Sequence, residues 1–190
     1  MLANRLIGLR RLGSYDEEVA ADSPVARWKL DETSGTTAND SIGSNHGTYA
    51  GVTLDQSPLI NIGRSVLFSG SSSGITIPDA AALDLGANFT LVGWGKTAAT
   101  AEQELVMKEQ VGSIWPAYSL RMLANGTVRC SVFGASGGSP VVTATTTATI
   151  NDNIKHRVSA MFRGSTDLKI YIDGVQRASV THSSFIILFY

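Results

Sequence analysis

The stretch from Asp31 to Gly47, DETSGTTANDSIGSNHG, concentrates side chains that can do chemistry, with almost no apolar residue among them. Calcium takes about six to eight oxygen ligands from carboxylates, amides and backbone carbonyls on a loop that can curl. Asp31, Asp40 and Asn45, together with Asn39, offer such oxygens, and glycines between them let the chain curl. Asp and Asn side chains also stabilise turns by binding backbone groups. The stretch therefore predicts either a calcium site formed by Asp31, Asp40 and Asn45 or a polar turn network held by Asp40.

A pair of carboxylates suggests hydrolysis at first sight. Glu102 and Glu104 are two residues apart, so their side chains share one face if the segment is a strand. A retaining glycosidase needs two carboxyl groups about 5–5.5 Å apart. The next position on that face is Val106 rather than a third acid. We expect exposed structural charges here and no catalytic pair.

Nucleophilic catalysis has equally little support. His46, His156 and His182 are present, but no Gly-x-Ser-x-Gly motif accompanies them, and the serines of 70–74 have the composition of a turn. Cys130 is the only cysteine, which excludes an internal disulfide and a cysteine-based zinc site. Because Cys130 falls among alternating apolar residues, we expect it in the core. We predict that the chain is not an enzyme.

Sugar binding requires exposed aromatic rings beside polar groups. Trp28 and Trp94 lie inside strand-like segments and are expected to be core residues. Trp115 lies in the loop sequence GSIWPAYS, and Tyr118 follows closely. We predict Trp115 and Tyr118 as contacts for a glycan or a protein, with packing of Trp115 on the domain edge as the alternative.

Composition limits the partners further. The chain has 190 residues, enough for one ordinary domain, with 43% hydrophobic and 16% charged residues. Its net charge of −1 provides no basic field to attract nucleic acid or anionic lipid. No apolar run approaches the roughly 18 residues of a membrane span. We therefore expect no nucleic-acid partner and no membrane span.

Short alternating segments with turn residues between them predict antiparallel strands, as in a sandwich or barrel. Two hairpins are marked by Asn125-Gly126 and Asp173-Gly174, which are typical of type I′ turns. The expected strands are 25–30, 47–54, 65–69, 74–78, 88–94, 104–108, 118–123, 127–133, 141–150, 156–162, 168–173 and 175–180.

These segments together resemble the laminin G-like, concanavalin A-like jelly-roll domains of phage virion proteins and bacterial secreted proteins. The resemblance implies an all-β antiparallel sandwich, the concanavalin A-like jelly roll, and rim loops that often bind calcium. The acid triplet Glu-x-Asp-x-Glu of jelly-roll glucanases is absent. We divide the chain into an N-terminal arm, residues 1–21, and a laminin G-like domain, residues 22–190. The matching pieces are 22–51, 65–70, 75–94, 105–109, 118–132 and 154–179.

The C-terminus departs from the family, whose members continue well past the strand at 175–180. Here the chain ends in the apolar run Phe185–Tyr190. We interpret this run either as a strand that replaces the last strand pair, within or between subunits, or as the end of a truncated reading frame that lacks it. An unpaired sheet edge is a template for association.

Two functions remain open at this point. The first is a non-enzymatic structural or adhesion module of a phage particle, in a tail, fibre or decoration protein. It would contact other virion proteins, itself or a cell-surface glycan, using the short basic arm Met1–Gly13 and the C-terminal strand. The N-terminus lacks the apolar run of a secretory signal, which favours the virion. The alternative is a secreted or cell-surface bacterial carbohydrate-binding module, assisted by calcium.

Overall fold

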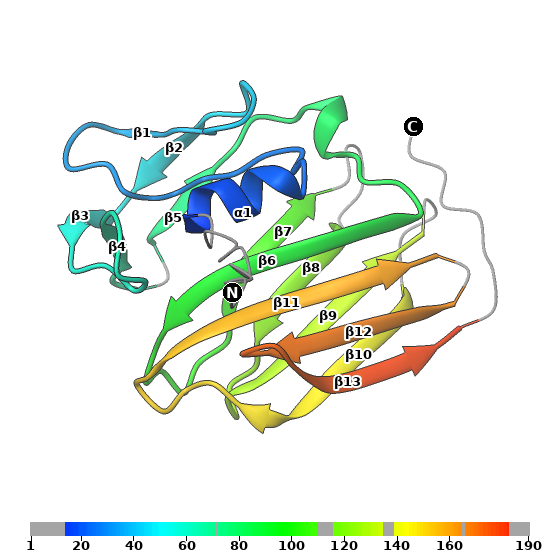
Figure 1. Cartoon of the computed structure of the whole chain (residues 1–190). Coiled ribbons are helices and arrows are strands. Elements are labelled where there is room, and N and C mark those ends of the chain that lie inside the picture. The colour runs from blue at the N-terminus through cyan, green and yellow to red at the C-terminus, as the bar shows by residue number, and fades with distance from the viewer. Residues whose placement is uncertain (1–13, 71, 110–115, 135–138, 165, 183–190) are drawn as a thin grey trace, which may run out of the picture.

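Two four-stranded antiparallel sheets stack face to face in the computed structural model of the chain (Figure 1). The structure describes residues 14–70, 72–109, 116–134, 139–164 and 166–182. We call the sheet with strand order β10-β9-β8-β7 sheet I and the sheet with order β13-β12-β11-β6 sheet II. The strands are β6 (Asn88–Lys96), β7 (Gln103–Glu109), β8 (Pro116–Met122), β9 (Thr127–Phe133), β10 (Pro140–Thr149), β11 (Lys155–Arg163), β12 (Asp167–Ile172) and β13 (Val175–Thr181).

Smaller elements cover one end of this sandwich. A three-stranded sheet has the order β1-β2-β5, and β3 pairs with β4 in a two-stranded sheet. Figure 1 shows the short helix α1 above β6 and beside these small sheets. The elements are α1 (Tyr15–Ala21), β1 (Thr37–Ala38), β2 (Gly47–Ala50), β3 (Val52–Gln56), β4 (Ser65–Phe68), β5 (Gly74–Thr76) and the 3-10 helix η1 (Ala81–Leu83). The predicted all-β sandwich is confirmed.

The core lies between the two large sheets and follows from the period of two along each strand. On β11 the inward residues Val158, Ala160 and Phe162 are buried, and so are their partners on β12. Cys130 of β9 is fully buried opposite them, as predicted, and burial raises the pKa of its thiol to about 12. Each fully buried large apolar side chain contributes roughly 1.5–3 kcal/mol to folding.

The two predicted hairpin turns differ. Asp173 and Gly174 both have positive φ, 52° and 79°, which confirms a type I′ turn. In the other turn only Gly126 has positive φ, so the type I′ prediction is wrong there. The side chain of Asn125 accepts hydrogen bonds from the backbone N–H and hydroxyl of Thr127, which holds a longer turn instead.

The predicted first strand, 25–30, is also wrong. Only an isolated bridge joins Trp28 to Asp40, and Leu30 has a φ of 56°, which an extended strand cannot accommodate. The backbone N–H of Arg27 donates to the Asp40 carboxylate rather than to a neighbouring strand. The segment is therefore held by the Asp40 side chain and by backbone contacts with Asp40 and Ser41, and the first regular strand in the described residues is β1.

The predicted arm, residues 1–21, contains a helix at its end. Ser14 caps α1: its hydroxyl accepts from the backbone N–H of Glu17, whose side chain in turn accepts from the Ser14 N–H. This reciprocal capping box explains why the helix begins here. Met1–Gly13 and Phe185–Tyr190, to which the predictions gave partner contacts, lie outside the described residues. Within the described part, every helix is too short or too polar to cross a membrane.

Candidate functional site

Asp40 organises the stretch Asp31–Gly47, which we call the rim loop. Its Oδ1 accepts from the backbone N–H groups of Arg27 and Ile42, both at 3.0 Å. Its Oδ2 accepts from the backbone N–H of Asn45 at 3.1 Å and from the Asn45 side-chain amide at 3.2 Å. Burial acts to raise the pKa of this carboxyl, but the backbone donors outweigh burial and lower it to about 2. Asp40 thus stabilises the loop as a charged acceptor.

A second carboxylate, Glu32, binds Asn39 within the rim loop and Tyr49 of β2. Its Oε1 accepts from the backbone N–H and side-chain amide of Asn39 at 2.8 and 2.9 Å, and its Oε2 accepts from the Tyr49 hydroxyl at 2.6 Å. Burial, the hydrogen bond to Glu32 and the negative charges of Glu32 and Asp31 together raise the pKa of Tyr49. Of the three predicted calcium ligands, the structure brings Asp40 and Asn45 together, while Asp31 lies near Glu32 and Tyr49.

The arrangement of oxygens bears on the calcium prediction. Both carboxylate oxygens of Asp40 already accept N–H hydrogen bonds, and Asn45 presents its amide nitrogen to them rather than its oxygen. The backbone oxygen of Asn45 accepts from the Trp28 indole at 2.7 Å. No cluster of three or more His, Cys, Asp or Glu side chains suited to a metal ion occurs among the described residues. As placed, these residues do not fit a calcium ion. Their hydrogen bonds are those of the polar turn network that was the alternative prediction. Calcium binding itself stays a prediction.

Of the two aromatic residues predicted to contact a ligand, Tyr118 lies in the described part of the chain and Trp115 does not. Tyr118 is buried, packs its ring against Phe89 at 5.3 Å between centroids, and donates its hydroxyl to the Leu83 carbonyl at 3.1 Å. Burial raises the pKa of its phenol to about 12. Tyr118 therefore belongs to the core and has no surface to offer a ligand. Trp115 lies outside the described residues.

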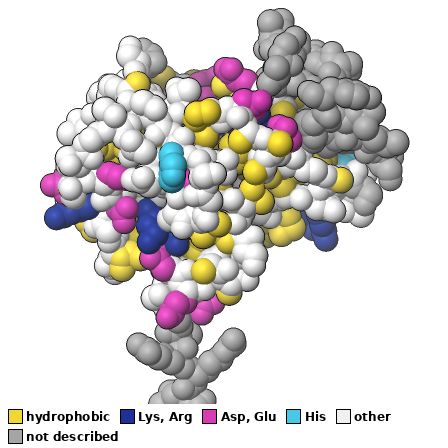
Figure 2. All heavy atoms as spheres, turned by 90° about the horizontal axis from the view of Figure 1, so that it is seen from above, with side chains coloured by type: hydrophobic (Ala, Val, Ile, Leu, Met, Phe, Trp, Pro, Cys, Tyr) yellow, Lys and Arg dark blue, Asp and Glu magenta, His cyan; other side chains and the backbone are white. Residues whose placement is uncertain are grey.

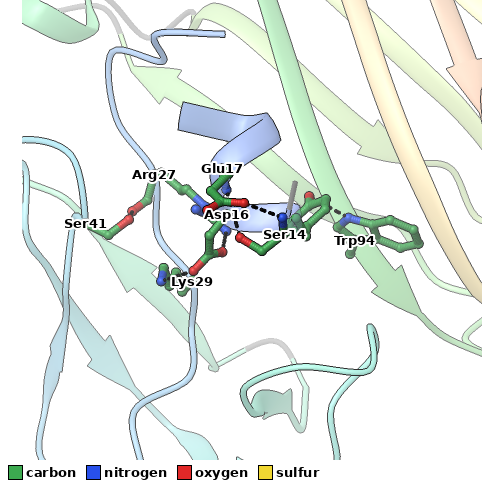
Figure 3. A network of polar contacts seen from close by, with 8 residues as sticks. Ser14, Asp16, Glu17, Arg27, Lys29, Ser41 and Trp94 are labelled. Carbon is green, nitrogen blue, oxygen red and sulfur yellow. Dashed lines mark hydrogen bonds and ion pairs between the residues drawn. The ribbon is translucent and has the colours of Figure 1, made fainter. Parts of the chain in front are cut away.

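Trp94 and Trp28, predicted as core residues, are half-buried and lie outside the core cluster. Because Leu91 points inward, Trp94 lies on the outer face of sheet II. Its indole donates to the Tyr15 hydroxyl at 2.9 Å, so it contacts α1 (Figure 3). The core prediction is wrong for both because their indole N–H groups reach polar partners outside the sandwich interior.

Ion pairs anchor α1 as well. Asp16 accepts from Arg27 at 2.5 Å and from Lys29 at 2.7 Å, and the Arg27 guanidinium lies 5.5 Å from the Tyr15 ring centroid. Figure 3 shows these groups converging between α1 and the segment that leads into the rim loop. The helix is thereby fastened to the segment before the rim loop, and its Tyr15 hydroxyl contacts Trp94 on the outer face of β6.

The candidate catalytic carboxylates bind an arginine. The terminal nitrogens of Arg121 lie 2.8 Å from Glu104 Oε1 and 3.7 Å from Glu102 Oε2. Burial raises the pKa of Glu104, the positive charge of Arg121 opposes that rise, and the negative charge of Glu102 adds to it. The pair therefore forms an ion cluster at the edge of sheet I.

The three histidines lie in different structural settings. Both ring nitrogens of His156 face carboxylates, with Asp173 at 2.7 Å and Asp152 at 3.1 Å. His46 Nδ1 accepts from the backbone N–H of Asp40, and the ring of His182 stacks on Phe162 at 5.4 Å. These contacts give the histidines structural roles and do not build a triad.

Sequence reasoning missed a polar row on the outer face of sheet I. Arg121 and Arg129 are register partners on β8 and β9, so both guanidinium groups leave the same face. Thr145 of β10 is the partner of Arg129 and accepts from its Nε at 3.2 Å. In the next row, the hydroxyls of Ser131 and Thr143 lie 3.0 Å apart. The hairpin turn was a usable signal, since Arg121 and Arg129 are equidistant from Asn125.

We call Arg121, Arg129, Ser131, Thr143 and Thr145 the arginine face. Arg129 and Thr145 are exposed there, whereas Ser131 is buried. Figure 2 views the molecule from above the sandwich, where acidic and basic side chains are scattered among hydrophobic side chains and white atoms, with no large basic field on the face shown.

A family model described as the concanavalin A-like lectin/glucanases superfamily, of laminin G type, matches residues 69–188. The chain belongs to this superfamily. Its match covers both large sheets, including the arginine face, and leaves α1 and the rim loop outside. A comparison with curated protein sequences gave no significant match.

Two solved structures share the fold of this laminin G-type chain. One is an S-layer domain-containing protein from Clostridium thermocellum, with 19% identity, a TM-score of 0.52, and coverage of 84% of this chain and 73% of that one. The other is the binding domain of Paraclostridial Mosquitocidal Protein 1, with 14% identity and a TM-score of 0.56. There the match covers 80% of this chain but only 41% of the other. At these identities the likeness shows the fold alone.

Proposed function

We propose that the chain is a non-enzymatic adhesion module that binds its target through side chains on the surface of the sandwich. The observation that carries this proposal is that the two candidate catalytic acids, Glu104 and Glu102, both form ion pairs with Arg121. A glycosidase needs one carboxyl to be a free proton donor and another to reach the sugar. The arrangement supports recognition rather than cleavage.

The two proteins of similar fold are consistent with an adhesion role. One is the binding domain of a mosquitocidal protein, and the other is part of an S-layer domain-containing protein. We propose accordingly that this module acts outside the cell or on a particle surface. Its setting, in this proposal, is a phage tail, fibre or decoration protein that contacts other virion proteins, copies of itself or a cell-surface glycan.

A secreted bacterial carbohydrate-binding module is the second candidate, favoured by the lectin-type fold. The two candidates separate by experiment. Purified chain is tested on a glycan array and for association with phage particles from the same host. Specific glycan hits without particle association support the secreted module. Particle association supports the virion role, and the release of reducing sugar from any bound glycan contradicts the non-enzymatic proposal.

The calcium-assisted form of the second candidate has its own test. Thermal melting is followed in chelator and in millimolar calcium, with Asp31→Ala and Asp40→Asn beside the unaltered chain. A melting temperature that rises with calcium and no longer does so in Asp40→Asn supports a site at the rim loop. An unchanged melting temperature contradicts it.

A further inference from the structure

From the arginine face we infer that this module recognises glycans through their carboxylate groups, with Arg129 as the residue that binds the carboxylate. The inference rests on the proposed adhesion function and adds to it the site and the chemical class of ligand. Its starting point is the like-charged pair, Arg121 and Arg129, placed directly opposite one another on neighbouring strands. Like charges in that position destabilise a sheet.

The two arginines differ in how their charge is balanced. Arg121 has Glu104 at 2.8 Å and Glu102 at 3.7 Å. Arg129 makes no ion pair with any carboxylate of the described residues, and the only hydrogen bond of its side chain there runs from Nε to Thr145. Its two terminal nitrogens therefore remain available on an exposed strand position. A guanidinium fork of this kind binds a carboxylate through two parallel hydrogen bonds.

The surroundings of Arg129 indicate a sugar rather than a more highly charged polymer. The hydroxyl groups of the exposed Thr145 and the half-buried Thr143 lie on the same face, and hydroxyls bind the hydroxyls of a sugar as donors and acceptors. The net charge of −1 provides no field for nucleic acid. A polymer with one carboxylate on each sugar ring can place that carboxylate on the Arg129 guanidinium and its ring hydroxyls beside the threonine hydroxyls.

The row is long enough for an extended chain. Glu104, Arg121, Arg129 and Thr145 are successive register partners across the four strands of sheet I. With strands about 4.8 Å apart, this row spans roughly 14 Å across the sheet. In the neighbouring row Ser119 and Ser131 are buried, so only the half-buried Thr143 adds a hydroxyl group beside it. A polyuronate bound at Arg129 therefore runs toward Thr145 and away from Glu104, because the acidic edge of the sheet repels its carboxylates.

The test measures binding of the full 190-residue chain to polygalacturonate and to its fully methyl-esterified form, which has the same backbone without the charge. Alginate and hyaluronate are added as further carboxylated chains, and neutral glucan and xylan serve as uncharged ones. All titrations contain a chelator, which excludes bridging by calcium. The variants are Arg129→Gln, Arg129→Lys and, as a matched control on the other sheet, Arg177→Gln, an exposed arginine of β13.

We expect at least one carboxylated chain to bind, and Arg129→Gln to weaken its binding about tenfold, the usual size for one charge-assisted hydrogen-bonded pair. Methyl esterification should weaken binding to a similar degree and abolish the effect of Arg129→Gln. Arg129→Lys should be intermediate, and Arg177→Gln should bind like the unaltered chain. Melting curves of Arg129→Gln must show that the variant stays folded.

Equal binding of Arg129→Gln and the unaltered chain to the carboxylated chains overturns the inference. So does a failure of all three carboxylated chains to bind. If neutral chains bind in either case, the adhesion function stands and only the carboxylate site is wrong. If neither class of glycan binds and no particle association is found, the proposed function fails as well.

Discussion

The rim loop and the arginine face are both rich in polar side chains, but they use them in opposite ways. In the rim loop, Asp40 and Glu32 accept hydrogen bonds on all four of their oxygens from groups of the same chain. On the arginine face, Arg129 keeps two terminal nitrogens without a partner among the described residues. A high density of polar residues therefore does not by itself mark a ligand-binding site. A ligand needs hydrogen-bonding groups that the fold has left available.

The largest effect is expected from removing the centre of the rim loop. Asp40→Ala leaves the N–H groups of Arg27, Ile42 and Asn45 without their acceptor, in a place that water reaches poorly. The free energy of unfolding should fall by about 2–4 kcal/mol. Urea unfolding at neutral pH measures it, with Asp31→Ala as the control, which should change it by less than about 0.5 kcal/mol. Equal losses in the two variants would remove the special role given to Asp40.

Acid should reveal the same carboxylate. The folded-state pKa of Asp40 is about 2, below the value of about 3.9 in an unfolded chain. Its stabilising contribution is therefore complete above the unfolded pKa and is lost as the pH falls through the folded pKa. Between pH 5 and 2, the stability of Asp40→Asn should fall less steeply than that of the unaltered chain. Parallel curves for the two proteins would show that other carboxylates control the acid limit.

The two arginines of the outer face should respond differently to the same substitution. Arg121→Gln leaves Glu104 and Glu102 close together without their cation, so we expect a loss of about 1 kcal/mol in the free energy of unfolding. The double variant Arg121→Gln with Glu104→Gln should recover part of that loss. An additive double variant would mean that the ion cluster contributes nothing to folding.

Arg129→Gln should have the smallest effect on stability. It removes one hydrogen bond to Thr145 but also removes a like charge opposite Arg121. We expect the free energy of unfolding to stay the same or to rise by up to about 0.5 kcal/mol. Thermal melting at low salt measures this change. A clear loss of stability would indicate that Arg129 is a structural residue, as Asp40 of the rim loop is, rather than a residue left available for a ligand.

The strands of the sandwich could be predicted because their residues alternate with a period of two. β9 and β11 were found at nearly their full length, since Cys130 and Phe162 share inward faces with apolar neighbours. The segment 25–30 also alternates, but its backbone groups bind the side chain of Asp40 instead of a strand. The alternation of apolar and polar residues within a short segment does not reveal that Asp40, thirteen residues from Arg27, will bind its backbone.

The candidate site was harder to predict, for a physical reason. Tyr118 has the same parity as Leu120 and Met122, so its inward orientation was readable once the strand was known to begin at Pro116. Arg129 gave no signal by itself, because what distinguishes it is the lack of a carboxylate partner. Whether a charge is already balanced depends on register between strands, which became visible only with β7, β8 and β9 in place.

A nitrogen-15 NMR titration with oligogalacturonate, followed at the backbone amides and the arginine side chains, distinguishes binding at the arginine face from binding at the rim loop. We predict that shifts concentrate at Arg129, Thr145 and Thr143, with the Arg129 Nε–H signal moving most, while the rim-loop amides of Ile42 and Asn45 stay in place. Shifts concentrated in the rim loop, with Arg129 unmoved, would contradict the account and return the binding site to the stretch Asp31–Gly47.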